Sequence, residues 1–271
     1  LAVSAILNIA WDLLFVAVFH WGIAGAAYAT IFAQYVSGIG ILLYVLFRCR
    51  SLFPERKDLC FDGGILKEIA GLSSLTCLQQ SVMNFGILMV QGLVNSFGAT
   101  TMAAFAAAVK IDTFAYLPVQ DFGNAYSTFI AQNYGAGNKE RIRRGTKESF
   151  AISTAFSLVI SALVFAFAAP LMQIFVSSAE TAVIASGVRY LRIEGAFYFG
   201  IGCLFLLYGY YRAIKRAEMS VVLTVISLGI RVLLAYVLSA TFLGETGIWM
   251  AIPIGWILAA LTGLSSMRKT W

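Results

Sequence analysis

The chain has 271 residues, of which 60% are hydrophobic and only 12% are charged, and its mean hydropathy is +0.85. Because a water-soluble domain carries about twice that share of charge, the composition excludes an ordinary soluble protein and indicates a chain that lies mostly in a lipid bilayer. The net charge of +6 does not indicate a nucleic-acid partner, since basic residues beside apolar spans orient membrane helices.

Eight stretches are long and apolar enough to cross a bilayer, which takes about 20 residues. They are 1–18, 24–47, 65–95, 102–134, 149–176, 183–211, 219–240 and 246–266. They predict an all-α polytopic membrane protein with eight transmembrane helices. Within the fourth span, Pro118 predicts a bend, because proline removes a backbone donor and crowds the preceding turn.

The loops between these spans alternate in charge. Basic residues gather in the loops 48–64 and 135–148, after residue 211 and in the tail, whereas the other loops carry little charge. The positive-inside rule places the basic loops in the cytoplasm. The C-terminus is then expected on the cytoplasmic side. The spacing of the four cysteines matches no zinc or redox motif, and no cofactor is expected.

A faint internal repeat divides the chain, because residues 5–16 resemble residues 224–235. Same-sense repeats of a helical bundle are one way to build a transporter. The repeat predicts four parts: 1–47 as the last two helices of an N-terminal lobe, 48–64 as a cytoplasmic linker, 65–266 as a complete six-helix C-terminal lobe, and 267–271 as a cytoplasmic tail. The chain is then expected to be a C-terminal fragment that lacks about four helices of the whole protein.

Charged residues inside the spans are costly in lipid and usually have a function. The seven in this chain are Asp12, Lys110, Asp112, Asp121, Arg192, Glu194 and Arg231. Counted from the outer ends of their helices at ~1.5 Å per residue, Asp112 and Glu194 both lie about 16 Å deep, near the middle of a ~30 Å core. Lys110 and Arg192 lie two residues earlier, at about 13 Å by the same rise.

These four charges form a layer on two helices. Residues two apart on a helix point to different sides, so we expect pairs across the helices, Lys110 with Glu194 or Asp112 with Arg192. One interpretation is a polar cavity in which a carboxylate exchanges its partner for a proton or Na⁺. The alternative is a pair of static salt bridges that fix the register of the helices.

Five other polar residues of the spans are further candidates. Gln79 and Gln80 lie near the middle of the third span and would add amide ligands. Asp121, beyond the proline, either meets water at the bend or caps backbone groups that the proline frees. Asp12 and Arg231 occupy matching positions in the two repeats and face either a central cavity or an interface.

Several stretches resemble the multidrug and toxic compound extrusion (MATE) family, and the sequence is most similar to its bacterial DinF-like branch. The matching stretches are 7–15 and 22–30 for the fifth and sixth helices, 78–81 and 91–98 for the seventh, 110–112, 118 and 132–138 for the eighth, and 190–195 for the tenth. The most specific pieces are Gly-Ala-Ala-Tyr-Ala-Thr at 25–30 and Gln-Asn-Tyr-Gly-Ala-Gly at 132–137.

The resemblance implies a twelve-helix protein of two six-helix lobes in the bacterial cytoplasmic membrane. It implies alternating access, in which H⁺ or Na⁺ is exchanged for organic cations or other toxic compounds, by a protein that is monomeric when whole. It also implies a cation site on the seventh, eighth and tenth helices, which here falls on Gln79, Gln80, Asp112 and Glu194, with Na⁺ a possible ion at the two acids.

The chain departs from the family pattern in two places. Many relatives have Leu-Asp-Pro where this chain has Trp11-Asp12-Leu13, so the fifth helix is expected to be straighter. Some relatives carry a carboxylate near the positions of Gln79 and Gln80, and its absence argues against a Na⁺ site of that type.

The sequence leaves three other functions open. A flippase for a lipid-linked sugar needs a strongly cationic cavity, for which the span candidates are Lys110, Arg192 and Arg231. A membrane-embedded enzyme needs a nucleophile with a base, or a metal cluster, but the sole histidine, His20, lies in an outer loop. The third is a truncated fragment that transports nothing by itself, because an incomplete cavity exposes polar groups to lipid.

Overall fold

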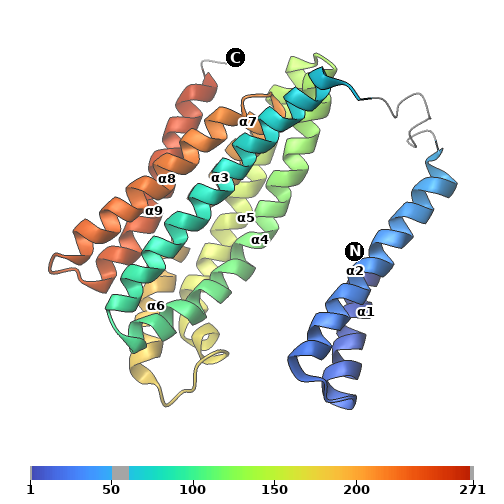
Figure 1. The fold of residues 1–271 in the computed structure, drawn as a ribbon. Helices are drawn as coiled ribbons and strands as arrows, with labels where there is room; N and C mark the ends of the chain where they lie inside the picture. Colours follow the sequence, from blue (N-terminus) through green and yellow to red (C-terminus); the bar gives the residue numbers. More distant parts are fainter. Residues whose placement is uncertain (1, 51–60, 269–271) are drawn as a thin grey trace. The chain divides into compact units, whose positions relative to one another are not determined.

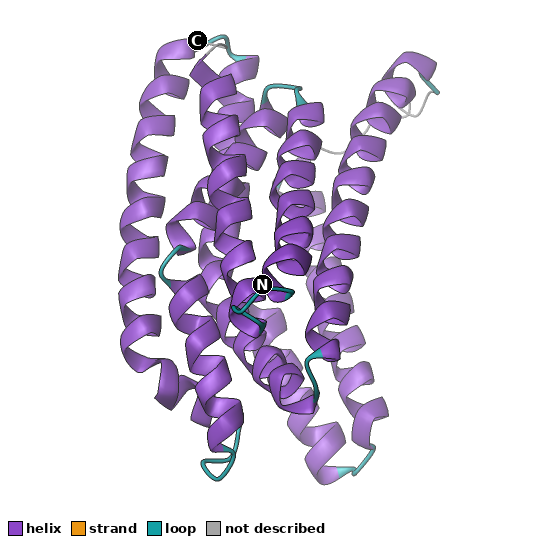
Figure 2. Ribbon diagram, turned by 90° about the vertical axis from the view of Figure 1, so that its left-hand side faces the viewer, coloured by secondary structure: helices purple, strands orange, loops and turns teal. Residues whose placement is uncertain are grey.

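The computed structural model describes residues 2–50 and 61–268. They belong to two compact units, Leu1–Ile65 and Leu66–Trp271, and each unit is described by itself. The described residues are helical with short turns and contain no strand (Figures 1 and 2). Most of the 48–64 segment, expected to be a linker, lies outside the described residues.

The first unit is a pair of neighbouring helices. It consists of α1 (Ala2–Asp12), the π-helix η1 (Leu13–Val18) and α2 (Gly22–Arg48), and α1 packs beside α2. Directly after Asp12 the backbone takes the wider π turn, which no residue pattern in the sequence predicted. The turn after η1 is packed by aromatic rings, since Phe15 stacks on Trp21 with centroids 5.2 Å apart.

The described residues of the second unit form the seven helices α3 to α9, whose ribbon is drawn in Figure 1. They are α3 (Gly63–Ser96), α4 (Ala99–Gly135), α5 (Lys139–Gln173), α6 (Thr181–Gly195), α7 (Tyr198–Ala213), α8 (Ala217–Ser239) and α9 (Glu245–Arg268). The 132–137 motif ends α4 and turns the chain, because Gly137 takes φ +69°, a value that favours glycine. Asn138 then caps α5 by accepting a hydrogen bond from the Arg141 backbone N–H at 3.0 Å.

Six of the described helices are long and apolar enough to cross a membrane, and the bent pair of α6 and α7 makes a seventh if it is counted as one span. The stretch Val3–Val18 is apolar but shorter. The chain is therefore a multi-pass membrane protein. The number of eight spans stays a prediction, as do the domain divisions.

The helices are not interrupted at every proline, and one break has no proline beside it. α4 continues through Pro118 as one helix, whereas α5 leaves helical geometry at Phe167, three residues before Pro170. The stretch 183–211 is not one continuous helix, as it was expected to be, because α6 ends at Gly195 and α7 continues from Tyr198 at 52° to it. This break places the ends of two half-helices inside one span.

Aromatic packing and small residues hold the second unit together. Trp249 of α9 is fully buried, stacks on Phe105 of α4 at 5.6 Å and meets Tyr190 of α6 edge-on at 5.0 Å. Gly209 of α7 lies so close to α4 that an added Cβ would be 2.7 Å from the Gly123 carbonyl oxygen. Small residues permit this close approach of backbones, the usual basis of helix packing in membranes.

Candidate functional site

The two acids expected at the same depth are both buried in the second unit. Asp112 lies on α4 and is 2% exposed, and Glu194, the second-last residue of α6, is 4% exposed. The two carboxylates interact directly with each other. Two negative charges held together away from water repel each other strongly, so the arrangement requires compensation.

Two tyrosine hydroxyls supply part of that compensation. Tyr198 donates a hydrogen bond to Asp112 Oδ1. Tyr190, one turn before Glu194 on α6, is within hydrogen-bonding reach of both carboxylates. The remaining oxygens, Asp112 Oδ2 and Glu194 Oε2, are buried with no hydrogen-bond partner of good geometry among the described residues. Two acceptor atoms of the site thus receive no hydrogen bond from the described residues.

Arg231 of α8 is the cation that interacts with both acids. It is half-buried, and its Nε is buried without a hydrogen-bond partner in the described part of the chain. One guanidinium balances one carboxylate, so the group carries one excess negative charge when both acids are ionised. We call Asp112, Glu194, Tyr190, Tyr198 and Arg231 the acid-pair cluster.

The break between α6 and α7 builds this cluster. Glu194 is the last residue but one before the break, and Tyr198 is the first residue after it. The hydrogen bond from Tyr198 to Asp112 therefore joins α7 to α4 at the point where the bent span changes direction. Discontinuous helices of this kind commonly hold the ion or substrate sites of secondary transporters.

Lys110 and Arg192 do not join the acids, and the predicted cross-helix pairs are wrong. Both side chains are exposed, and each lies over an aromatic ring, Lys110 over Phe175 at 6.0 Å and Arg192 over Phe165 at 5.3 Å. Successive residues are about 100° apart around a helix, so residues two apart differ by about 200°. Once the acids point inward, the bases must point outward.

The other candidates lie outside the cluster. Gln79 is buried and Gln80 is exposed, and neither is among the groups that act on the two acids. Asp121 is exposed, and Asp12 is half-buried in the other unit with its Oδ1 unpartnered there. The described residues contain no group of three or more His, Cys, Asp or Glu side chains that could hold a metal ion.

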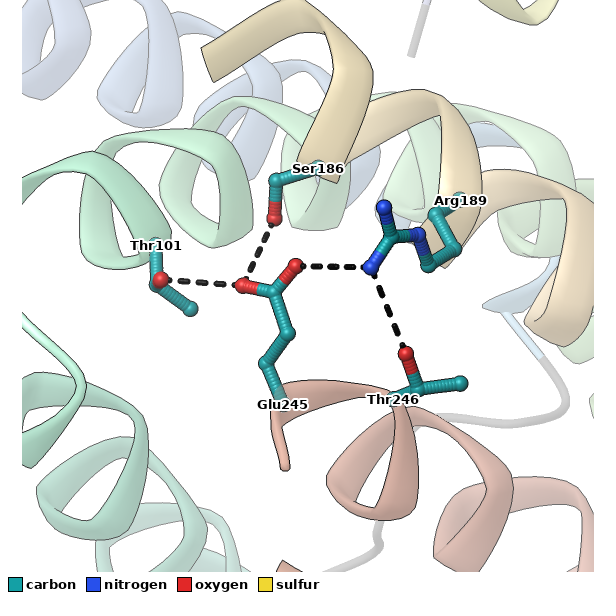
Figure 3. A network of polar contacts seen from close by, with 5 residues as sticks. All are labelled: Thr101, Ser186, Arg189, Glu245 and Thr246. Carbon is teal, nitrogen blue, oxygen red and sulfur yellow. Dashed lines mark hydrogen bonds and ion pairs between the residues drawn. The ribbon is translucent and has the colours of Figure 1, made fainter. Parts of the chain in front are cut away.

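Figure 3 shows a second acidic centre, around Glu245. The sequence did not predict it. Glu245, the first residue of α9, accepts hydrogen bonds at Oε2 from Thr101 Oγ1 at 2.9 Å and from Ser186 Oγ at 3.1 Å. Arg189 donates to its Oε1 at 3.3 Å and to Thr246 Oγ1 at 3.5 Å. This Glu245 network ties α4, α6 and α9 together. The sequence contains little indication of this network, because Glu245 is a single charged residue in a short loop between two predicted spans.

A helical membrane bundle with a discontinuous span and buried, partly unsatisfied acids has the architecture of a secondary transporter. The MatE family model matches residues 75–237. The chain belongs to this family, as the resemblance implied.

Individual proteins agree with this assignment. The chain is 30% identical over 263 residues to the "Probable multidrug resistance protein YpnP" of Bacillus subtilis, covering 96% of this chain and 58% of that protein. It is 24% identical over 276 residues to the DNA damage-inducible protein F of Escherichia coli, covering 100% and 58%.

The fold is similar to that of a MOP superfamily transporter from Pyrococcus furiosus, with a TM-score of 0.92, 24% identity, and coverage of 99% of this chain and 60% of that one. The chain spans about three fifths of the length of these proteins.

Proposed function

We propose that this chain is the C-terminal part of an efflux transporter of the bacterial cytoplasmic membrane that exchanges H⁺ or Na⁺ for drugs or other toxic organic compounds. Membership of the MatE family and the name of the Bacillus subtilis relative support export of such compounds. The acid-pair cluster at a helix break supports the coupling to a cation. This buried pair, with two unpartnered oxygens, is the observation that carries the proposal.

The charge balance of the cluster explains how a cation would be coupled to export. One proton bound by the pair, on Asp112 or on Glu194, supplies a donor and cancels the excess negative charge beside Arg231. The cluster is then neutral and stable without water. When the proton leaves, the excess charge returns and requires water or a cationic compound, because an uncompensated charge in the bilayer core is costly.

The helix break links this charge to movement. Deprotonation restores repulsion between α4 and α6, and Tyr198 connects Asp112 to the start of α7 across the bend. When the distance between the two acids changes, the Tyr198–Asp112 hydrogen bond therefore moves the start of α7 relative to α6. We propose that the two half-helices reorient in this way between states open to each side, which is alternating access.

Everted vesicles that contain the intact gene product test this proposal. Dye export should follow an imposed pH gradient or an imposed Na⁺ gradient, which identifies the coupling ion. Asp112→Asn and Glu194→Gln should each reduce ion-driven export by about tenfold or more, because the variants lack the second ionisable group of the pair. Glu148→Gln, which neutralises an exposed acid on α5, is the control and should export normally. Full coupling in both cluster variants would disprove the proposal.

A further inference from the structure

The buried face of α5 is polar, whereas its exposed face is apolar. Three serines lie on the buried face, each about one turn after the previous one: Ser153, Ser157 and Ser161, which are 3%, 1% and 7% exposed. None of their hydroxyl oxygens has a hydrogen-bond partner among the described residues. Side chains on the exposed face include Ile152, Phe156, Val159 and Leu163. We call the three serines the serine row.

Close packing alone does not explain the serine row. Small residues permit helices in a membrane to approach each other, and alanine serves this purpose as well as serine. A buried hydroxyl without a partner is costly, and the row has three in succession. Buried water commonly bonds to polar atoms of this kind. The row therefore points to water as its ligand.

The serine row lies along α7, whose first residue, Tyr198, donates a hydrogen bond to Asp112. Gly202 follows Tyr198 by about one turn of α7. A Cβ added to Gly202 would be 2.9 Å from Ser157 Oγ and 3.0 Å from Ser153 Oγ. Because glycine has no side chain, these two hydroxyls face the bare backbone of α7.

Ser161 brings the row to the break between α6 and α7. Val164 follows Ser161 by about one turn on the same buried face of α5. A Cβ added to Gly195, the last residue of α6, would be 3.2 Å from Val164 Cγ1. In the other direction, the buried face continues to Thr146, whose hydroxyl lies 2.8 Å from that of Tyr126. The polar face thus leads from the level of the two acids to the start of α5, which the predicted topology places on the cytoplasmic side.

A layer of three rings lies on the other side of the acid-pair cluster. Phe105, Tyr190 and Trp249 are buried, and their centroids are 5.0, 5.6 and 5.7 Å apart. These rings lie about one turn further along α4, α6 and α9 than the Glu245 network, whose hydrogen bonds join the same three helices (Figure 3). Packed apolar constrictions of this kind exclude water. In this structure the acids are therefore approached along the serine row.

We propose that the coupling proton leaves the acid-pair cluster along the serine row, on water molecules that the three hydroxyls bind. This inference rests on the proposed function and adds the path of the proton and the side of its release. A proton that leaves Asp112 or Glu194 is taken up by a water molecule. Each water or hydroxyl then accepts one proton and passes its own to the next. The serines are unchanged afterwards, and one H⁺ reaches the cytoplasm for each carboxyl group that ionises.

Substituted cysteines in the intact gene product test whether water reaches the row. All other cysteines are replaced by alanine, and sealed vesicles of either orientation are treated with Ag⁺, which binds thiols that water reaches. The thiols left unreacted are then measured with a maleimide dye after denaturation. Ser157→Cys and Ser161→Cys replace only an oxygen by a sulfur. Both cysteines should react at least about tenfold faster from the cytoplasmic face than from the outer face.

Two further variants locate the ends of the path. Ala168→Cys is the matched control, because Ala168 is 0% exposed on the same buried face of α5 but lies beyond the helix break. This cysteine should stay unreactive from both faces. Phe105→Ala opens the ring layer, and combined with Ser161→Cys it should let Ag⁺ react from the outer face as well. Continued exclusion from that face would show that the rings are not the seal.

Export measurements separate this path from the proposed function. Replacing all three serines by alanine should slow export driven by a pH gradient by about threefold or more, and an unchanged rate would overturn the path. If Asp112→Asn loses coupling while the cysteines of the row react no faster than Ala168→Cys, the proposed function stands and the row only packs helices. If a Na⁺ gradient alone drives export, the transporter is confirmed and the proton path is overturned.

Discussion

The acid-pair cluster and the Glu245 network use the same chemistry on two shared helices, α4 and α6, with opposite results. Both oxygens of Glu245 are bound, one by Thr101 and Ser186 and the other by Arg189. In the cluster, one oxygen of each acid has no partner. A buried polar atom without a partner costs about 1–3 kcal/mol. The network therefore fastens helices, whereas the cluster is suited to bind and release a cation.

Removing the cation of the acid-pair cluster should have the largest effect on stability, and it tests whether the two acids depend on a counter-charge. Arg231→Met leaves two buried acids without their counter-charge, and loss of one partner of a buried ionic group costs about 3–5 kcal/mol. The free energy of unfolding, measured in a denaturant titration in detergent, should fall by that order. Adding Glu194→Gln should recover most of the loss, because the double variant, with one carboxylate and no guanidinium, has the same net charge as the unmodified cluster. A loss that the second substitution does not relieve would show that Arg231 does not compensate the acids.

Removing the acid of the network should have the next largest effect. Glu245→Ala takes away an acceptor shared by three donors, and hydrogen bonds to charged groups contribute about 1.5–3 kcal/mol. Because Arg189 is half exposed, at 52% of its side-chain surface, we expect a loss near the lower end, about 2 kcal/mol. The same titration measures it. The export that remains in the variant should depend on the same ion as in the unmodified protein. A change of coupling ion would contradict the view that the Glu245 network stabilises the fold and does not bind the coupling ion.

A smaller change sharpens the comparison within the network. Thr101→Val removes one of two hydroxyls that donate to the same oxygen of Glu245. Since Ser186 still binds that oxygen, no acceptor is left unpaired, and the expected loss is about 1 kcal/mol. The Ser186→Ala variant should behave alike. In the double variant the loss should exceed the sum of the single losses, because Glu245 Oε2 then has neither hydroxyl. Strict additivity in this double-mutant cycle would refute the shared role.

An exposed ion pair gives the smallest effect and a reference for both buried centres. Lys215, in the turn between α7 and α8, donates a hydrogen bond to Glu68 at 2.6 Å. This bond and the charge of Glu68 raise the pKa of Lys215 above its usual value. As long as Glu68 stays ionised, the pair's stabilisation is thus complete below the ordinary lysine pKa and is lost as the pH rises through the raised pKa.

Solvent screening keeps the contribution of this pair small. Lys215→Met should leave the midpoint of thermal unfolding at pH 7 nearly unchanged, and added salt should reduce any remaining difference, because salt screens exposed charges. A strong effect of Lys215→Met at pH 7 would show that the exposed pair is an unsuitable reference.

Part of the candidate site followed from counting along the chain. The depths of Asp112 and Glu194 depend only on the helix rise and on where each helix begins, so the sequence placed them in one layer. Helix geometry also required Lys110 to point away from Asp112, but it could not say which of the two faces the interior. Packing decided that, because α4 and α6 turn their acids toward Tyr198 and Arg231.

The sequence by itself determined that the chain crosses a membrane as helices and belongs to the MATE family, because apolar length and local motifs are written along the chain. Only the tertiary structure revealed the break between Gly195 and Tyr198, since no proline marks it. The same holds for the Glu245 network, whose donors Thr101 and Ser186 are 144 and 59 residues away from Glu245. Hydrogen bonds between distant helices depend on how helix faces rotate and pack, and no local pattern records that rotation.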